Sequence, residues 1–143
     1  MFAYQGSPVF IFGLSTLIAT LASFILGWLW YGSLFGKTWM AHMNIKQADI
    51  KKSKQKSMTK SALLNFIGTL IAACVLTGIL TTYSLTLGNA MCLTFFLWLA
   101  FYAATTHLGT VIWESKPMTL FWINSLYWLA SLELMTLIIT AWM

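Results

Sequence analysis

Four polar side chains lie inside long apolar stretches of the sequence, where such groups are costly and often functional. A histidine can relay protons near neutral pH, and amides or a carboxyl can line a path for a polar substrate. Alternatively, these groups only bond to one another between helices, each bond contributing roughly 0.6–2 kcal/mol. The four candidates are Asn65, His107, Asn124 and Glu133.

No arrangement typical of a catalytic or metal site accompanies them. The sequence has no nucleophile–base–acid set, Gly-rich phosphate loop, HExxH motif or paired carboxylates. Cys74 and Cys92 lack a CxxC spacing and a histidine cluster, which argues against zinc or redox chemistry. We therefore expect no enzymatic activity, no catalytic residue, no metal and no cofactor.

The composition of the 143-residue chain is that of a membrane protein. Hydrophobic residues make up 59% of it and charged residues only 8%, whereas soluble domains average about 25% charged residues. So few charges could not cover the surface of a soluble fold. Most of the surface is therefore expected to face lipid.

The apolar residues fall into stretches long enough to cross the roughly 30 Å hydrocarbon core as helices. We predict a single all-α domain over residues 1–143, an integral membrane four-helix bundle with up-down-up-down topology. Gly88-Asn89 marks the expected turn after the second helix. Leu26-Gly27 with Trp30 is echoed by Leu108-Gly109 with Trp113, which allows two parallel two-helix repeats. The predicted helices span residues 9–30, 61–83, 90–113 and 118–142.

Lysine placement predicts the orientation of this bundle. All but one of the eight lysines lie in the loop 37–60, the other is Lys116, and there is no arginine. Because lysines are retained on the cytoplasmic side, both termini are predicted to be periplasmic. No aromatic residues interleave the lysines from Lys46 to Lys60, so nucleic acid is not an expected partner. The lysines expected to contact anionic lipid heads are Lys51, Lys52, Lys54 and Lys56.

An aromatic and glycine-rich box closes the first helix. We expect Trp30 and Tyr31 to lie at the membrane interface. Gly32 and Gly36 are expected to turn the chain so that Trp39 lies back on the headgroups. The residues of this interface box are Trp30, Tyr31, Gly32, Gly36, Lys37 and Trp39.

The pattern Gly27-x-x-Trp30-Tyr31-Gly32-x-Leu34-Phe35-Gly36-Lys37-x-Trp39 resembles the hallmark of a small bacterial four-span family, domain of unknown function 1761 (DUF1761). Its second hallmark opens the fourth helix, where Pro117, Asn124 and Tyr127 match it, as does the closing Trp142. Ser33 stands where the family often carries proline, and Trp128 where a polar residue is common. The resemblance implies a four-helix protein of the bacterial inner membrane and implies no reaction.

Depth separates Glu133 from the other polar candidates. At 1.5 Å per residue, Asn65, His107 and Asn124 all lie roughly 6–9 Å from the cytoplasmic ends of their helices and could form one hydrogen-bonded layer. Glu133 lies roughly 22 Å into the last helix and about 180° around it from Asn124. An ionised carboxyl there costs roughly 2.5–3.5 kcal/mol, so we expect a protonated acid that meets other protein. It shares its face with Leu126, Leu129, Thr136 and Thr140.

Two functions of different classes follow from these features. The first is a small bundle that forms a homo-oligomer, most simply a dimer, or binds a larger membrane protein through its polar and small-residue faces. The alternative is a minimal transporter or channel that acts as an oligomer, with the intramembrane polar residues lining the path.

Overall fold

The computed structural model of the protein describes residues 13–43 and 56–142, and all of their regular structure is helical. The first part of the chain forms α1 (Leu14–Leu29), the π-helical segment η2 (Trp30–Leu34) and the short helix α2 (Gly36–His42). The second part forms α4 (Lys56–Tyr83), α5 (Leu87–Leu97), η3 (Trp98–His107), α6 (Leu108–Trp113) and α7 (Met118–Ala141). The segment η3 is also π-helical, and it joins α5 and α6 into one long rod.

Four helical segments are long and apolar enough to cross a membrane, which confirms the predicted all-α four-helix architecture. They run over Leu14–Leu34, Thr59–Tyr83, Leu87–Trp113 and Met118–Ala141. The predicted helix 9–30 extends further at its C-terminal end than expected, and residues 9–12 lie outside the described residues. The third helix begins at Leu87, three residues before the predicted start.

Both turns between the later helices use a serine in the left-handed region. Ser84 has φ 46° between α4 and α5, and Ser115 has φ 53° between α6 and α7. The prediction of a turn at Gly88-Asn89 is therefore wrong, because both residues lie inside α5. Polar Ser84 at the end of an apolar helix accepts the strained backbone, and its hydroxyl lies 3.5 Å from the Thr81 carbonyl oxygen.

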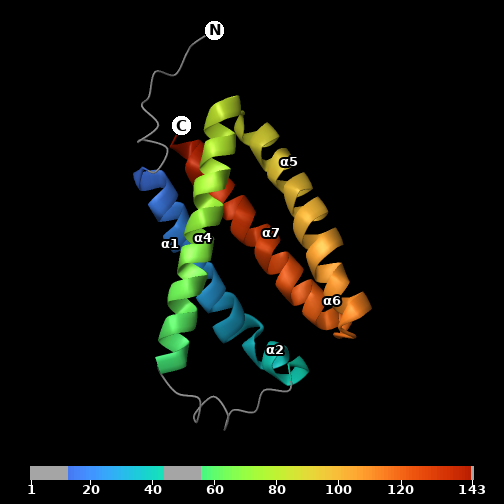
Figure 1. The fold of residues 1–143 in the computed structure, drawn as a ribbon. Coiled ribbons are helices and arrows are strands. Elements are labelled where there is room, and N and C mark those ends of the chain that lie inside the picture. The colour runs from blue at the N-terminus through green and yellow to red at the C-terminus, as the bar shows by residue number, and fades with distance from the viewer. Residues whose placement is uncertain (1–12, 44–55, 143) are drawn as a thin grey trace.

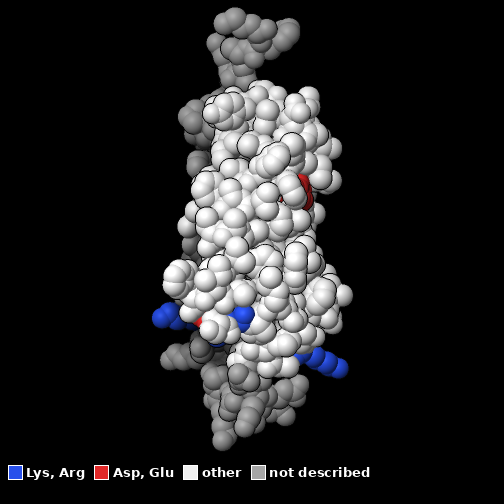
Figure 2. Space-filling model, turned by 90° about the vertical axis from the view of Figure 1, so that its right-hand side faces the viewer, with Lys and Arg blue, Asp and Glu red and all other residues white. Residues whose placement is uncertain are grey.

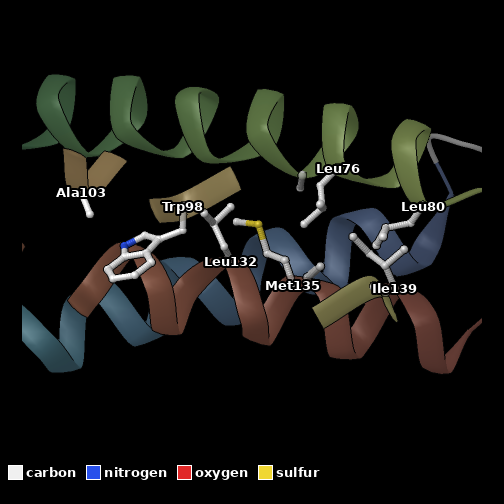
Figure 3. Packing of buried hydrophobic residues seen from close by; sticks show 10 residues of the cluster. Leu76, Leu80, Trp98, Ala103, Leu132, Met135 and Ile139 are labelled. Atoms are coloured by element: carbon white, nitrogen blue, oxygen red, sulfur yellow. The ribbon is translucent and has the colours of Figure 1, made fainter. Parts of the chain in front are cut away.

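The bundle is organised around α7. Nine residues of α7 are buried, compared with four in α1. α1 and α4 pack against one side of α7 and the α5–α6 rod packs against the other. Figure 3 shows the centre of the core, where Met135 and Leu132 of α7 meet Leu76 of α4 and Trp98 of η3.

Large apolar side chains cover the outside of the bundle, as expected for a surface that faces lipid. Exposed aromatic residues lie near both ends of the spans, including Trp122 and Trp142 of α7. These two tryptophans are twenty residues apart, or about 30 Å along a helix, which is the thickness of the hydrocarbon core. Figure 2 shows one acidic side chain part-way along the bundle, between the two aromatic ends of the spans. The visible lysines instead gather at one end of the bundle.

This end, called the Lys-bearing end, carries the three lysines whose side chains the structure describes. Lys37 lies in α2, Lys60 lies in α4 and Lys116 lies between α6 and α7. The start of α1 and the end of α7 lie together at the opposite end (Figure 1).

The predicted internal repeat is reproduced only loosely. Trp30, which the sequence echo pairs with Trp113, contacts α7, whereas Trp113 is 86% exposed. The better structural counterpart of Trp30 is Trp98, because each tryptophan opens a π-helical segment and donates a hydrogen bond to a carbonyl of α7.

Candidate functional site

Three aromatic side chains converge on three consecutive residues of α7. The indole N–H of Trp30 donates to the carbonyl oxygen of Ile123 at 3.1 Å, and the Trp98 indole donates to the carbonyl oxygen of Ser125 at 2.7 Å. Between them, the Tyr31 hydroxyl donates to Asn124 Oδ1 at 3.0 Å. A backbone carbonyl oxygen has two lone pairs, so each of these two carbonyls can accept the indole bond as well as its hydrogen bond within α7.

These three hydrogen bonds, which we call the clamp, give a structural reason why the aromatic box and Asn124 occur in one sequence. The box supplies Trp30 and Tyr31 at the end of α1, and α7 supplies Asn124. Besides its predicted place at the membrane interface, the box therefore has a packing role, because the Trp30 indole and the Tyr31 phenol of η2 bond to α7. Trp39 of α2 packs against the box, and the centroid of its ring lies 5.7 Å from that of the Tyr31 ring.

The two glycines of the box have different roles from those predicted. Neither has a positive φ, so the chain does not turn through left-handed glycines here. The direction changes instead through η2, where the Phe35 N–H bonds to the Trp30 carbonyl, and through Phe35 itself. A Cβ on Gly36 would overlap the Tyr31 carbonyl oxygen, whereas a Cβ on Gly32 would meet nothing within 4 Å.

A third glycine, Gly27, allows the closest approach of α1 to α7. A Cβ at this position would lie 2.8 Å from the Tyr127 hydroxyl oxygen. The Tyr127 ring is buried and stands 5.0 Å from the Tyr31 ring in an edge-on arrangement. Glycine at position 27 therefore makes room for the tyrosine of the second motif.

Beside these tyrosines the structure forms a cleft of about 360 Å³. One wall is α1, with Gly27 and Trp28, and the other is α4, with Ala62 and Asn65. Tyr127 and Trp128 of α7 form the floor. Residues from both sequence motifs thus surround one cavity near the Lys-bearing end.

The predicted hydrogen-bonded layer of Asn65, His107 and Asn124 does not form among the described residues. Asn124 bonds to Tyr31, while Asn65 is exposed and lines the cleft. His107 packs near Tyr102, and its Nε2 is buried with no hydrogen-bond partner in the described part of the chain. The reason is helix rotation, because η3 presents Trp98 and Tyr102 to α7 and leaves His107 at the edge of that contact.

Glu133 lies on the outward face of α7, opposite Asn124, as its position in the sequence predicts. One carboxyl oxygen, Oε2, is buried and has no hydrogen-bond partner among the described residues. Thr136 is not available to it, because its hydroxyl pairs with Thr94 of α5 at 2.8 Å and with the Leu132 carbonyl at 2.9 Å. The hydroxyl of Thr140, two turns further along α7, is likewise buried without a partner within residues 13–43 and 56–142.

The lysines predicted to contact lipid heads cannot be placed fully. Lys51, Lys52 and Lys54 lie outside the described residues, and Lys56 is the first residue of α4. Lys37 of the interface box is exposed at the Lys-bearing end. Within residues 13–43 and 56–142, no three His, Cys, Asp or Glu side chains are grouped closely enough to hold a metal ion.

Several residues that shape the site were not predicted to do so. Trp98, Tyr102 and the threonine pairs lie in apolar runs where no local spacing distinguishes them from lipid-facing neighbours. Tyr102 stacks on Trp128 with ring centroids 4.9 Å apart. Thr16 of α1 and Thr77 of α4 share a hydrogen bond of 3.0 Å in the opposite half of the bundle.

Comparison with known proteins supports the resemblance carried by the two motifs. Neither the curated proteins nor the solved structures contain a match to this chain. The family model described as "Protein of unknown function (DUF1761)" matches residues 14–140, which include the clamp, the cleft and Glu133. The chain therefore belongs to the DUF1761 family of proteins of unknown function.

Proposed function

We propose that this protein is a non-catalytic membrane bundle that assembles with a second copy of itself through the outward face of α7. Glu133 lies on this face with Leu126 and Leu137, which are 40% and 46% exposed. The supporting observation is the Glu133 side chain, which is partly exposed on this face while its carboxyl Oε2 has no hydrogen-bond partner among the described residues. Along the helix it lies about 16.5 Å from Trp122 and about 13.5 Å from Trp142, close to the middle of the span.

The chemistry of a carboxylic acid favours a second copy as the partner. An ionised carboxyl at this depth costs roughly 2.5–3.5 kcal/mol, so the protonated form is favoured. A protonated carboxyl is both a donor and an acceptor, so two of them satisfy each other. A two-fold interface places the same patch of both copies face to face, which brings two such acids together at one axis.

A path for ions or solutes through one copy has less support. The interior around α7 is filled by Leu80, Met135 and Ile139, each no more than 1% exposed. Transport by this protein would therefore need a contact between copies. The same experiment can separate the two functions.

The test measures the oligomeric state of purified protein in one detergent by light scattering after gel filtration. We expect a dimer for the natural chain and for Glu133→Gln, which keeps hydrogen bonding. Glu133→Leu should raise the dimer dissociation constant about tenfold, the equivalent of 1.4 kcal/mol. Glu114→Leu is the matched control, because Glu114 is exposed in the turn before α7.

Equal dimer populations for the natural chain and Glu133→Leu would contradict the proposal. A dimer that survives Glu133→Gln but loses a proton or cation flux in liposomes would instead favour transport. A dimer that never forms, with Glu133 crosslinking only to a larger protein, would replace self-assembly by binding to another membrane protein.

We also propose that the Lys-bearing end faces the cytoplasm of a bacterial inner membrane, with both termini periplasmic. The described lysines Lys37, Lys60 and Lys116 gather at this end, which supports the orientation.

A further inference from the structure

The cleft between α1 and α4 has the form of a lateral opening toward lipid. The two helices are in contact at Phe24 and Phe66, whose rings are 5.6 Å apart. Beyond this contact, toward the Lys-bearing end, α1 and α4 separate (Figure 1). The cleft of about 360 Å³ occupies the space between them, with Trp28 at its rim 74% exposed.

One wall of the cleft presents an amide that has no hydrogen-bond partner among the residues that the structure describes. Asn65 is exposed, and its side chain makes no hydrogen bond to the described residues. It lies six residues, or about 9 Å, inside the span that starts at Thr59. A polar group facing lipid at this depth needs a partner, because water is scarce there.

The partner at this depth can be the polar backbone of a lipid. Exposed tryptophan marks the membrane interface, where the ester groups and the glycerol of phospholipids lie, and Trp28 shares the cleft with Asn65. The amide of Asn65 can donate to an ester carbonyl. The aromatic floor of Tyr127 and Trp128 offers an apolar surface for the first carbons of an acyl chain.

The charges at this end of the bundle favour a lipid with an anionic headgroup. Lys60 is exposed on another side of α4, five residues before Asn65, and Lys37 of the aromatic box is exposed on α2; both lie at the same end of the bundle as the cleft without lining it. Glu114, the described acidic residue of this end, lies on the separate turn between α6 and α7. The cleft is therefore neutral and aromatic inside and lies at the positively charged end of the bundle.

From these features we infer that the cleft binds one phospholipid with an anionic headgroup, taken from the leaflet at the Lys-bearing end. Its headgroup lies among the lysines of the Lys-bearing end, its ester group bonds to Asn65, and its acyl chain lies between α1 and α4. This site is independent of the Glu133 face, which is on the outward side of α7.

Native mass spectrometry of the full chain in micelles that contain phosphatidylglycerol or phosphatidylcholine tests the inference. The natural chain should retain one phosphatidylglycerol per copy and prefer it over phosphatidylcholine. Ala62→Trp fills the cleft from an exposed position and should reduce retention at least about tenfold. Asn65→Leu, which removes one hydrogen bond, should reduce it about two- to tenfold.

Matched controls use exposed residues away from the cleft. Ala100→Trp in η3 and Asn89→Leu in α5 should retain phosphatidylglycerol as the natural chain does. Equal retention by Ala62→Trp and Ala100→Trp would overturn the site. Equal retention of the two lipids by the natural chain would overturn the anionic headgroup, and full competition by soluble glycerol phosphate would overturn the role of the acyl chain.

Discussion

The aromatic box needs glycine where there is no space for a Cβ atom, and not because the backbone has unusual angles. At Gly36 the space for a Cβ is taken by the Tyr31 carbonyl oxygen, and at Gly32 that space is open. Gly27 likewise makes room for the Tyr127 hydroxyl. Gly27 and Gly36 therefore lie where two segments approach closely.

The two glycines of the box should respond differently to the same substitution. Gly36→Ala forces the start of α2 away from Tyr31 and should destabilise the fold by about 1–3 kcal/mol. Gly32→Ala adds a methyl group to open space within a helix and should be neutral or slightly stabilising. Thermal unfolding followed by circular dichroism in detergent measures both, and equal midpoints would show that the close approach at Gly36 has no consequence.

The hydrogen bond between Tyr31 and Asn124 provides a second test at this scale. Tyr31→Phe keeps the ring contacts and removes only the donor, which should cost about 0.5–1.5 kcal/mol. In the Asn124→Leu background the same substitution should cost much less, because the acceptor is already absent. Tyr83→Phe, at an exposed tyrosine of α4, is the control. An equal loss for Tyr31→Phe in both backgrounds would exclude this bond as the cause.

Among the helices, α7 is fastened differently in its two halves. Near the Lys-bearing end, aromatic donors from η2 and η3 bond to residues 123–125 of α7. In the opposite half, hydroxyl pairs join the helices, with Thr94 of α5 bonded to Thr136 of α7 at 2.8 Å. Small hydroxyl side chains allow close helix packing in lipid, where the hydrophobic effect does not drive association.

A double-mutant cycle measures the coupling across the hydroxyl pair. We expect Thr94→Val and Thr136→Val together to cost about 0.6 kcal/mol less than the sum of the single changes. Thr82→Val is the control, because the Thr82 hydroxyl bonds only within α4, to the Gly78 carbonyl. Strict additivity of Thr94→Val and Thr136→Val would show that the hydroxyl pair contributes nothing to the contact between α5 and α7.

For the whole molecule, the sequence predicts the architecture well and the site only in part. Apolar length and lysine placement predict the four spans, because lipid admits few alternatives to a continuous helix. Glu133 is placed on the outward face by helical periodicity alone. The turn at Ser84 could not be predicted, because glycine at position 88 is the stronger local turn signal.

The site depends on helix rotation and crossing, which no local pattern encodes. Asn65 and His107 have depths suited to meet Asn124, yet Asn65 faces the cleft and His107 lies at the edge of η3. The π-helical segments shift the residues that follow them around the helix axis, and regular helical spacing does not predict this shift.

Orientation in the membrane is a prediction for the molecule as a whole. Reporter fusions after Met143 and within residues 46–56 should show a periplasmic C-terminus and a cytoplasmic Lys-rich loop. Replacing Lys116 alone should leave this orientation unchanged, because the loop 37–60 carries the other seven lysines. A cytoplasmic C-terminus would contradict the proposed orientation.

Cysteine crosslinking in native membranes tests the self-assembly of α7 most directly. Leu137→Cys on the Glu133 face and Leu17→Cys on α1 make a matched pair, because both leucines are 46% exposed in the same half of the bundle. Both are placed in a chain in which Cys74 and Cys92 are changed to serine. Oxidation should give a disulfide-linked dimer from Leu137→Cys and little from Leu17→Cys. Equal dimer yields from the two positions, or none from Leu137→Cys, would contradict assembly through the outward face of α7.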